Sequence, residues 1–128
     1  MITTKEQIIE YFKSGIKDQK NFKIGIEHEK FLFNKQDDKR INYSKIKQMF
    51  SALVEFGWNP ILEKDNIIGL NKGGKNITLE PGNQIELSGD KLTNIHEACA
   101  ESQDYLFELR QVTKKLDIKI VSAGFDPI

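Results

Sequence analysis

The sequence predicts an α+β fold in which a mostly antiparallel sheet carries helices on its apolar side. The middle of the chain consists of short segments in which apolar and polar residues alternate. Turn residues separate these segments closely, and three stretches with helical spacing of apolar residues surround them. Antiparallel pairing is favoured because parallel strands need longer crossover connections.

The N-terminal part of the chain is expected to contain two helices and one strand. The first helix, the strand and the second helix are expected over residues 4–17, 22–34 and 43–56. Thr4 and Gln7 have the spacing of a capping box, which indicates where the first helix begins. One face of that helix is apolar and contains Ile8, Ile9, Phe12 and Ile16. Gly57 is suited to end the second helix.

Four short strands, a long helix and a last strand follow. The four strands are expected over residues 58–63, 67–71, 76–80 and 84–87. The helix is expected over residues 91–116, with an apolar face formed by Leu92, Ile95, Cys99, Ser102, Leu106, Leu109 and Leu116. The last strand is expected over residues 118–125. No capping element follows it, so we expect residues 1–128 to be the N-terminal part of a single longer domain.

The composition argues against several classes of protein. The chain has 19 basic and 19 acidic residues, and a general nucleic-acid-binding protein would have a basic excess. No apolar run exceeds three residues, so no membrane span is expected, and the N-terminus lacks the apolar core of a signal peptide. Cys99 is the only cysteine, so no disulfide can form within the chain. These features predict a cytoplasmic protein.

The first chemically distinctive motif lies in the strand expected over residues 22–34. Glu27 and Glu29 are two residues apart, so they point to the same face of a strand, whereas Ile26 and Leu32 point to the other. Neighbouring carboxylates repel one another, and a divalent cation such as Mg²⁺, which prefers oxygen ligands, turns that repulsion into attraction. The alternative is a solvated polar strand face, because two glutamates at this spacing are common.

A second acidic motif lies in the region of residues 77–88. Glu80, Gln84 and Glu86 share one parity, and the apolar residues Ile77, Leu79, Ile85 and Leu87 share the other. Pro81 and Gly82 interrupt the strand pattern, as often occurs beside functional sites. If both strands join one sheet with their apolar sides together, four carboxylates meet on the opposite face. We therefore expect a metal site formed by Glu27, Glu29, Glu80 and Glu86, with two solvated acidic strands as the alternative.

These motifs belong to an ordered series. The series runs GIEHEKF at 25–31, GWNPI at 57–61, NIIGL at 66–70, LEPGNQIELSG at 79–89 and GFDP at 124–127. It resembles the glutamate–cysteine ligases of plants and many proteobacteria over about residues 20–127. Asn83 stands where that family often has glycine, and asparagine also tolerates left-handed turns.

The resemblance implies part of a catalytic fold related to that of glutamine synthetase, in which the mostly antiparallel sheet is curved. It implies an ATP-dependent ligase that joins the γ-carboxylate of glutamate to the amine of cysteine through an acyl phosphate. This reaction is the first step of glutathione biosynthesis. Glutamate, cysteine and ATP would be the small-molecule substrates and Mg²⁺ the cofactor. Glu27, Glu29, Glu80 and Glu86 would be metal ligands, and Glu27 and Glu29 would be the catalytic residues.

The same resemblance implies that further groups are needed. Family members are much longer than 128 residues, and the remaining part would carry other metal ligands and the basic groups that hold ATP and glutamate. We therefore expect this chain alone to be inactive and to self-associate through an unsatisfied sheet edge. The alternatives are a noncatalytic metal- or ligand-binding module and a ligase of the same superfamily that uses another amine.

Three other motifs are given structural interpretations. Residues 69–75 match part of a phosphate-binding loop, but a strand pattern follows, so a hairpin turn is expected. His28 has the parity opposite to Glu27 and Glu29, which favours a structural hydrogen bond over zinc binding. Cys99 is expected to pack in the apolar face of its helix.

Overall fold

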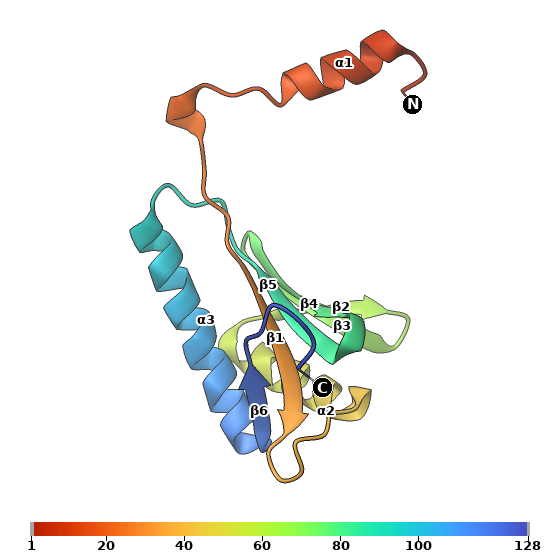
Figure 1. Cartoon of the computed structure of the whole chain (residues 1–128), viewed down its shortest axis with the longest axis vertical. Helices are drawn as coiled ribbons and strands as arrows, with labels where there is room; N and C mark the ends of the chain where they lie inside the picture. Colours follow the sequence, from red (N-terminus) through yellow and green to blue (C-terminus); the bar gives the residue numbers. More distant parts are fainter. Residues whose placement is uncertain (1, 128) are drawn as a thin grey trace.

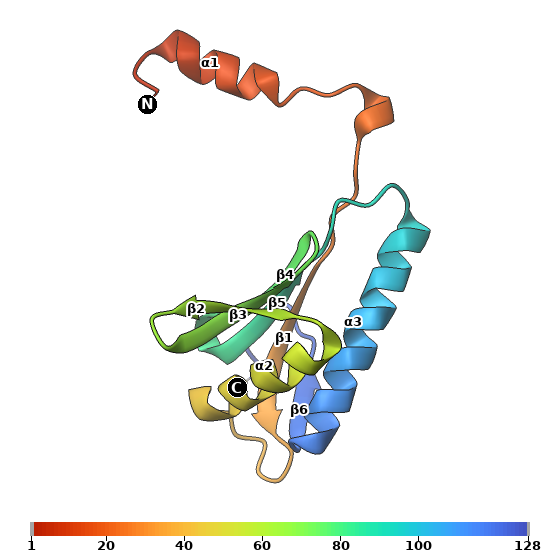
Figure 2. The ribbon, with the colours of Figure 1, turned by 180° about the vertical axis from the view of Figure 1, so that it is seen from behind.

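The computed structural model describes residues 2–127 and confirms the predicted α+β class. A six-stranded sheet, in which every pair of neighbouring strands is antiparallel, has the order β2-β3-β4-β5-β1-β6. Helices α2 and α3 cover one face of this sheet, and helix α1 stands apart from it (Figures 1 and 2). Among the helices within residues 2–127, none is long and apolar enough to cross a membrane.

The strands are β1 (Glu27–Asn34), β2 (Asn59–Glu63), β3 (Asn66–Lys72), β4 (Lys75–Glu80), β5 (Gln84–Ser88) and β6 (Ile118–Val121). The helices are α1 (Lys5–Ser14), α2 (Tyr43–Leu53) and α3 (Ile95–Lys115), together with the 3₁₀ turns η1 (Gln19–Asn21), η2 (Val54–Phe56) and η3 (Pro81–Asn83). Each predicted element is present, and most boundaries agree within a few residues.

The sheet combines local and distant strand pairs. Strands β2 to β5 form a meander in which each strand pairs with the next one along the chain. Strand β1 lies between β5 and β6: its residues 27–30 pair with β5 and its residues 31–34 pair with β6. Because β6 covers only the second half of β1, residues 27–30 lie at an open edge of the sheet.

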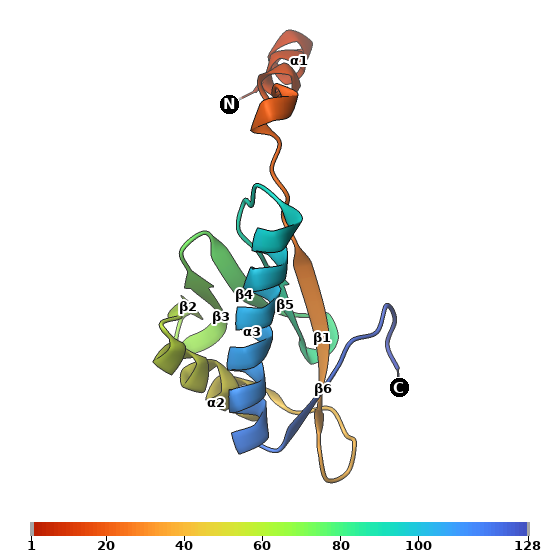
Figure 3. The ribbon, with the colours of Figure 1, turned by 90° about the vertical axis from the view of Figure 1, so that its left-hand side faces the viewer.

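The hydrophobic core lies between the sheet and helices α2 and α3 (Figure 3). Helix α2 begins at an Asn42 cap, whose side chain accepts a hydrogen bond from the backbone of Lys45. Its buried face consists of Ile46, Met49, Phe50 and Leu53. Gly57 ends the helical region with a φ of 87°, a left-handed conformation that glycine adopts without strain. The predicted role of Gly57 is therefore confirmed.

Helix α1 has the predicted capping box but no packing partner within the described residues. The Thr4 side chain accepts a hydrogen bond from the backbone of Gln7, and the Gln7 side chain accepts one from the backbone of Thr4. None of the residues of α1 is buried, and Phe12 is 73% exposed. The apolar face predicted from the sequence therefore faces outwards.

Helix α3 differs from its prediction in its start and in its buried face. It begins at Ile95 rather than near residue 91, because Leu92 forms a backbone bridge with Ile24 and Asn94 caps the helix. The buried residues are Ala98, Glu101, Tyr105, Leu109, Val112 and Thr113. Cys99 is exposed, so the expectation that it packs in the core is wrong. The sheet and α2 determine which face of α3 is buried. That face overlaps the predicted apolar face at Leu109 and is otherwise next to it.

Candidate functional site

The four candidate carboxylates share the face of the sheet opposite α2 and α3. Glu29 is the direct partner of Glu86 across β1 and β5, and Glu86 is the direct partner of Thr78 across β5 and β4. Directly opposed residues share a face, and so do residues two apart on one strand. Glu27 therefore shares the face of Glu29, and Glu80 shares the face of Thr78. The predicted common face is confirmed, whereas the metal-binding role stays a prediction.

Hydrogen bonds orient two of these carboxylates. The Thr78 hydroxyl donates to Glu80 Oε1 at 2.8 Å, and the Ser88 hydroxyl donates to Glu86 Oε1 at 3.3 Å. Glu27 and Glu29 are exposed to solvent.

The arrangement supplies only part of a metal shell. Within residues 2–127, no group of three or more His, Cys, Asp or Glu residues is gathered closely enough to hold a metal ion. The opposed pair Glu29 and Glu86 nevertheless offers two carboxylates with Cβ atoms about 5 Å apart. Mg²⁺ sites of phosphate-handling enzymes typically use one or two carboxylates together with waters and phosphate oxygens, so these residues fit such an ion as a partial set of ligands.

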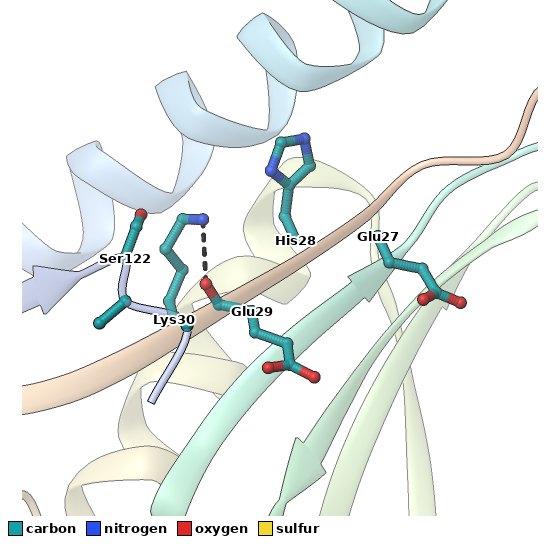
Figure 4. Close-up of a pocket in the computed structure, with 7 residues that line it drawn as sticks. Glu27, His28, Glu29, Lys30 and Ser122 are labelled. Carbon is teal, nitrogen blue, oxygen red and sulfur yellow. Dashed lines mark hydrogen bonds between the residues drawn. The ribbon is translucent and has the colours of Figure 1, made fainter. Parts of the chain in front are cut away.

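A cavity of about 510 Å³ lies at the open edge of β1. It is lined by Glu27, His28, Glu29, Lys30, Ser122, Ala123 and Gly124. We call it the edge pocket. Figure 4 shows that Glu27 and Glu29 point to one side of β1, whereas His28 and Lys30 point to the other side, towards α3. The edge pocket therefore has acidic groups on one side of the strand and basic groups on the other.

His28 makes the structural hydrogen bond that its parity predicts. Its Nε2 lies 3.0 Å from the hydroxyl oxygen of Ser102, and that hydroxyl donates to the Ala98 carbonyl at 2.9 Å. With the Ser102 proton used in this way, the tautomer that carries its proton on His28 Nε2 fits this contact. Burial lowers the pKa of His28, and the nearby charge of Lys30 lowers it further.

Lys30 is a site residue that the sequence reasoning missed. Its side chain lies on the helix side of β1, it is only 7% exposed, and its ammonium group donates to the Glu29 carbonyl oxygen at 3.1 Å. Burial lowers the pKa of this lysine. A signal was present in the sequence, because Lys30 has the same parity as the apolar residues Ile26 and Leu32.

A second cavity, of about 330 Å³, lies between β1, the η3 turn and the C-terminal segment. It is lined by Glu29, Phe31, Pro81, Gly82, Gln84 and residues 123–126. Arg40 borders this region: it donates to the Gly82 carbonyl oxygen at 2.6 Å and forms an ion pair with Asp126. Its guanidinium also lies over the Phe31 and Phe33 rings, 5.4 Å and 5.6 Å from their centroids. The sequence showed only that Arg40 belongs to a charged turn.

The segment that partly matches a phosphate-binding loop is a hairpin, as predicted. Residues 69–75 form the end of β3, a turn at Gly73 with a φ of 64°, and the start of β4. Its two lysines pair with carboxylates of α3: Lys72 with Glu108 at 2.7 Å and Lys75 with Glu101 at 3.9 Å. These contacts attach the hairpin to the helix and give it a structural role.

Comparisons with known proteins agree with the motif series. The family model described as glutamate-cysteine ligase family 2 (GCS2) matches residues 23–128. Over 125 residues the chain is 41% identical to glutamate–cysteine ligase A, chloroplastic, of Oryza sativa subsp. japonica, which covers 97% of the chain and 25% of that protein. It is 38% identical to the chloroplastic glutamate–cysteine ligase of Arabidopsis thaliana, over 97% of the chain and 24% of that protein. The chain therefore spans about a quarter of the length of the curated relatives it matches.

The predicted cytoplasmic location is contradicted by these comparisons. The relatives from Oryza sativa, Medicago truncatula and Arabidopsis thaliana are all named chloroplastic. A balanced charge and a single cysteine argue against a disulfide-rich secreted protein. They do not distinguish one compartment inside the cell from another, and for this reason the composition led to the wrong compartment.

Proposed function

Because this chain belongs to glutamate-cysteine ligase family 2, we propose that it supplies part of the active site of an ATP-dependent ligase. The ligase joins the γ-carboxylate of glutamate to the amine of cysteine through an acyl phosphate, which is the first step of glutathione synthesis. The names of the relatives support the reaction class and both amino-acid substrates. The oxygen-rich outer face of the sheet supports the use of Mg²⁺ and ATP.

The observation that carries this proposal is the opposed pair Glu29 and Glu86, with Glu27 and Glu80 on the same face. These four carboxylates would hold Mg²⁺, which when bound neutralises phosphate charge during phosphoryl transfer. Glu27 and Glu29 are the exposed pair at the open edge, so they are assigned the catalytic role. The hydroxyls of Thr78 and Ser88 keep Glu80 and Glu86 in fixed orientations.

The chain is proposed to be the N-terminal part of one catalytic domain. It corresponds to about a quarter of the relatives, and three or more metal-ligand side chains do not converge within residues 2–127. Further metal ligands and further groups that bind ATP and glutamate would come from residues outside this chain. In the longer protein, the open edge of β1 would then be covered by further residues. In the chain alone the edge would stay open, and it would lead to self-association.

The proposal is tested by measuring dipeptide formation and ADP release in the longer protein that contains this chain. Both products should depend on glutamate, on ATP with Mg²⁺, and on cysteine. In further assays, other amino acids replace cysteine as the amine substrate. Product formation with one of them but not with cysteine would identify a ligase that uses another amine. ATP, Mg²⁺ or glutamate binding without ADP release or dipeptide would instead show a noncatalytic binding module and would overturn the proposal.

A further inference from the structure

Lys30 is a buried cation that has no acidic partner within residues 2–127. It is 7% exposed, and its ammonium group donates to one uncharged acceptor, the Glu29 carbonyl oxygen. The ion pairs of the described residues do not include it. An ammonium group has three donors, so two of them are available to a further acceptor.

Two other partly buried lysines, which both have acidic partners, show that the surroundings of Lys30 are unusual. Lys72 and Lys75 have side chains that are 33% and 21% exposed, and each lies next to a carboxylate of α3. Lys30 is more deeply buried than either of them. Burying a charge is costly unless it is paired and hydrogen-bonded. An anion next to Lys30 would offset this cost, and the described part of the chain does not provide one.

The surroundings of Lys30 leave room for that anion. Lys30 and Ser122 line the edge pocket, whose volume is about 510 Å³, and Figure 4 shows both side chains on the α3 side of β1. Strand β6 pairs only with residues 31–34, so the edge of β1 is uncovered at this point. A ligand in the pocket can reach Lys30 from this edge while another part of it extends towards Glu27 and Glu29.

We propose that Lys30 binds an anionic group of a small-molecule ligand in the edge pocket, with the Ser122 hydroxyl as a second donor. A phosphate and a carboxylate have the same relevant chemistry, because both are oxyanions that accept charge-assisted hydrogen bonds. The inference deepens the proposed function, and it rests on that function for identifying the ligand as a ligase substrate. The binding of an anion does not itself require turnover.

The test uses three probes: inorganic phosphate, glutamate and ATP. Each is titrated into the chain at a concentration at which the chain is monomeric, and the amide signals of Lys30 and Ser122 are followed by NMR, which requires no substitution. At least one probe should shift both signals, and whether phosphate or glutamate does so identifies the bound group. Shifts confined to other parts of the chain, or the absence of binding by all three probes, would overturn the inference.

Lys30→Gln provides the second arm, with Lys119→Gln as the matched control. Lys119 forms an ion pair with Asp38 and does not line the edge pocket. Lys30→Gln should weaken binding of the active probe by about tenfold or more, because a hydrogen bond from a charged donor is lost. Lys119→Gln should change it by less than about twofold, because exposed charges are screened. Equal binding by the wild type and Lys30→Gln would overturn the inference.

The two proposals can fail separately. Anion binding that depends on Lys30, in a longer protein that forms no dipeptide, would reject the ligase function alone. Dipeptide formation together with probe binding that is indifferent to Lys30 would reject the anion site alone.

Discussion

The guanidinium group of Arg40 donates a 2.6 Å hydrogen bond to the carbonyl oxygen of Gly82, which joins two turns that are far apart in the sequence. Gly82 lies in the η3 turn, between the strands that carry Glu80 and Glu86. The same guanidinium forms an ion pair with Asp126. Arg40 therefore holds the η3 turn and the C-terminal segment against β1.

The first prediction concerns this connection. A lysine at this position would keep the charge but not the planar group that binds two partners and stacks on rings, so Arg40→Lys should lower the free energy of unfolding by about 1–2 kcal/mol. Urea unfolding measures this change. Amide hydrogen exchange should also become faster at Asn83, because Asn83 belongs to the η3 turn that Arg40 holds in place. Lys39→Ala is the control, because the Lys39 side chain is 81% exposed in its ion pair with Asp37. Equal stability and exchange in all three proteins would contradict the role of Arg40.

The second prediction concerns the exposed carboxylates. In the longer protein, Glu27→Gln and Glu29→Gln should each lower the turnover number by about a hundredfold, because the amide keeps the shape but loses the charge that attracts Mg²⁺. Thermal unfolding should change little, since both residues are exposed. Glu63→Gln, at the end of β2, serves as the control. Near-normal turnover in both variants would reject the catalytic assignment.

The third prediction concerns the polar contact between α3 and the β3–β4 hairpin. Glu108 accepts hydrogen bonds from the Trp58 indole at 2.6 Å and from Lys72 at 2.7 Å. Glu108→Ala leaves both donors without this acceptor, so the free energy of unfolding should fall by about 2–4 kcal/mol. Denaturant titration measures the loss. Glu10→Ala removes an exposed pair with Lys13 and should cost less than about 0.5 kcal/mol. A similar cost for both substitutions would show that the contact is not stabilising.

The fourth prediction concerns pH and the start of α3. The backbone hydrogen bond from Thr93 to Glu97 lowers the pKa of that carboxyl below its ordinary value of 4.5, and a bond from Asn94 contributes. Because the folded pKa is lowered, this stabilisation is present above pH 4.5 and is lost as the pH falls through the folded pKa. The protection factors of amides in the first turn of α3, which correct for the pH dependence of intrinsic exchange, should therefore fall as the pH is lowered from about 5 through the folded pKa.

Glu97→Gln separates this effect from general acid unfolding. The glutamine side chain does not titrate in this range, so the first turn of α3 should show no local loss of protection of its own. If the wild type and Glu97→Gln respond to acid in the same way, the hydrogen bond of Glu97 is not the cause.

The sequence predicted those parts of the fold that depend on local patterns. The capping box at Thr4, the left-handed end at Gly57 and the alternation over residues 27–30 of β1 are formed by neighbouring residues. The buried face of α3 was predicted only in part. Leu109 is buried as expected, whereas Cys99 is exposed, because Cys99 and Ala98 are adjacent on the helix and only the packed sheet decides which of them is buried. The exposure of α1 is also a tertiary property, since its apolar periodicity is the same with or without a partner.

The candidate site was predictable to the same extent. Parity alone places Glu27 and Glu29 on one face, and the register of β1 with β5 adds Glu86 as a direct partner. The sequence could not show that β6 ends beside Phe31 and leaves Lys30 at an open edge. It also could not show that Arg40 reaches Gly82, because that contact depends on how two distant turns approach one another.

The position of β1 between β5 and β6 has a consequence for the order of folding events. The meander of β2 to β5 pairs neighbours in the chain, so it can form as soon as that region has left the ribosome. Strand β1 is synthesised earlier, yet its first half must wait for residues 84–88 and its second half for residues 118–121. Distant pairs form slowly because a long loop must close first. The acidic face is therefore completed late, and a chain arrested before residue 84 emerges would carry Glu27 and Glu29 on an unpaired strand.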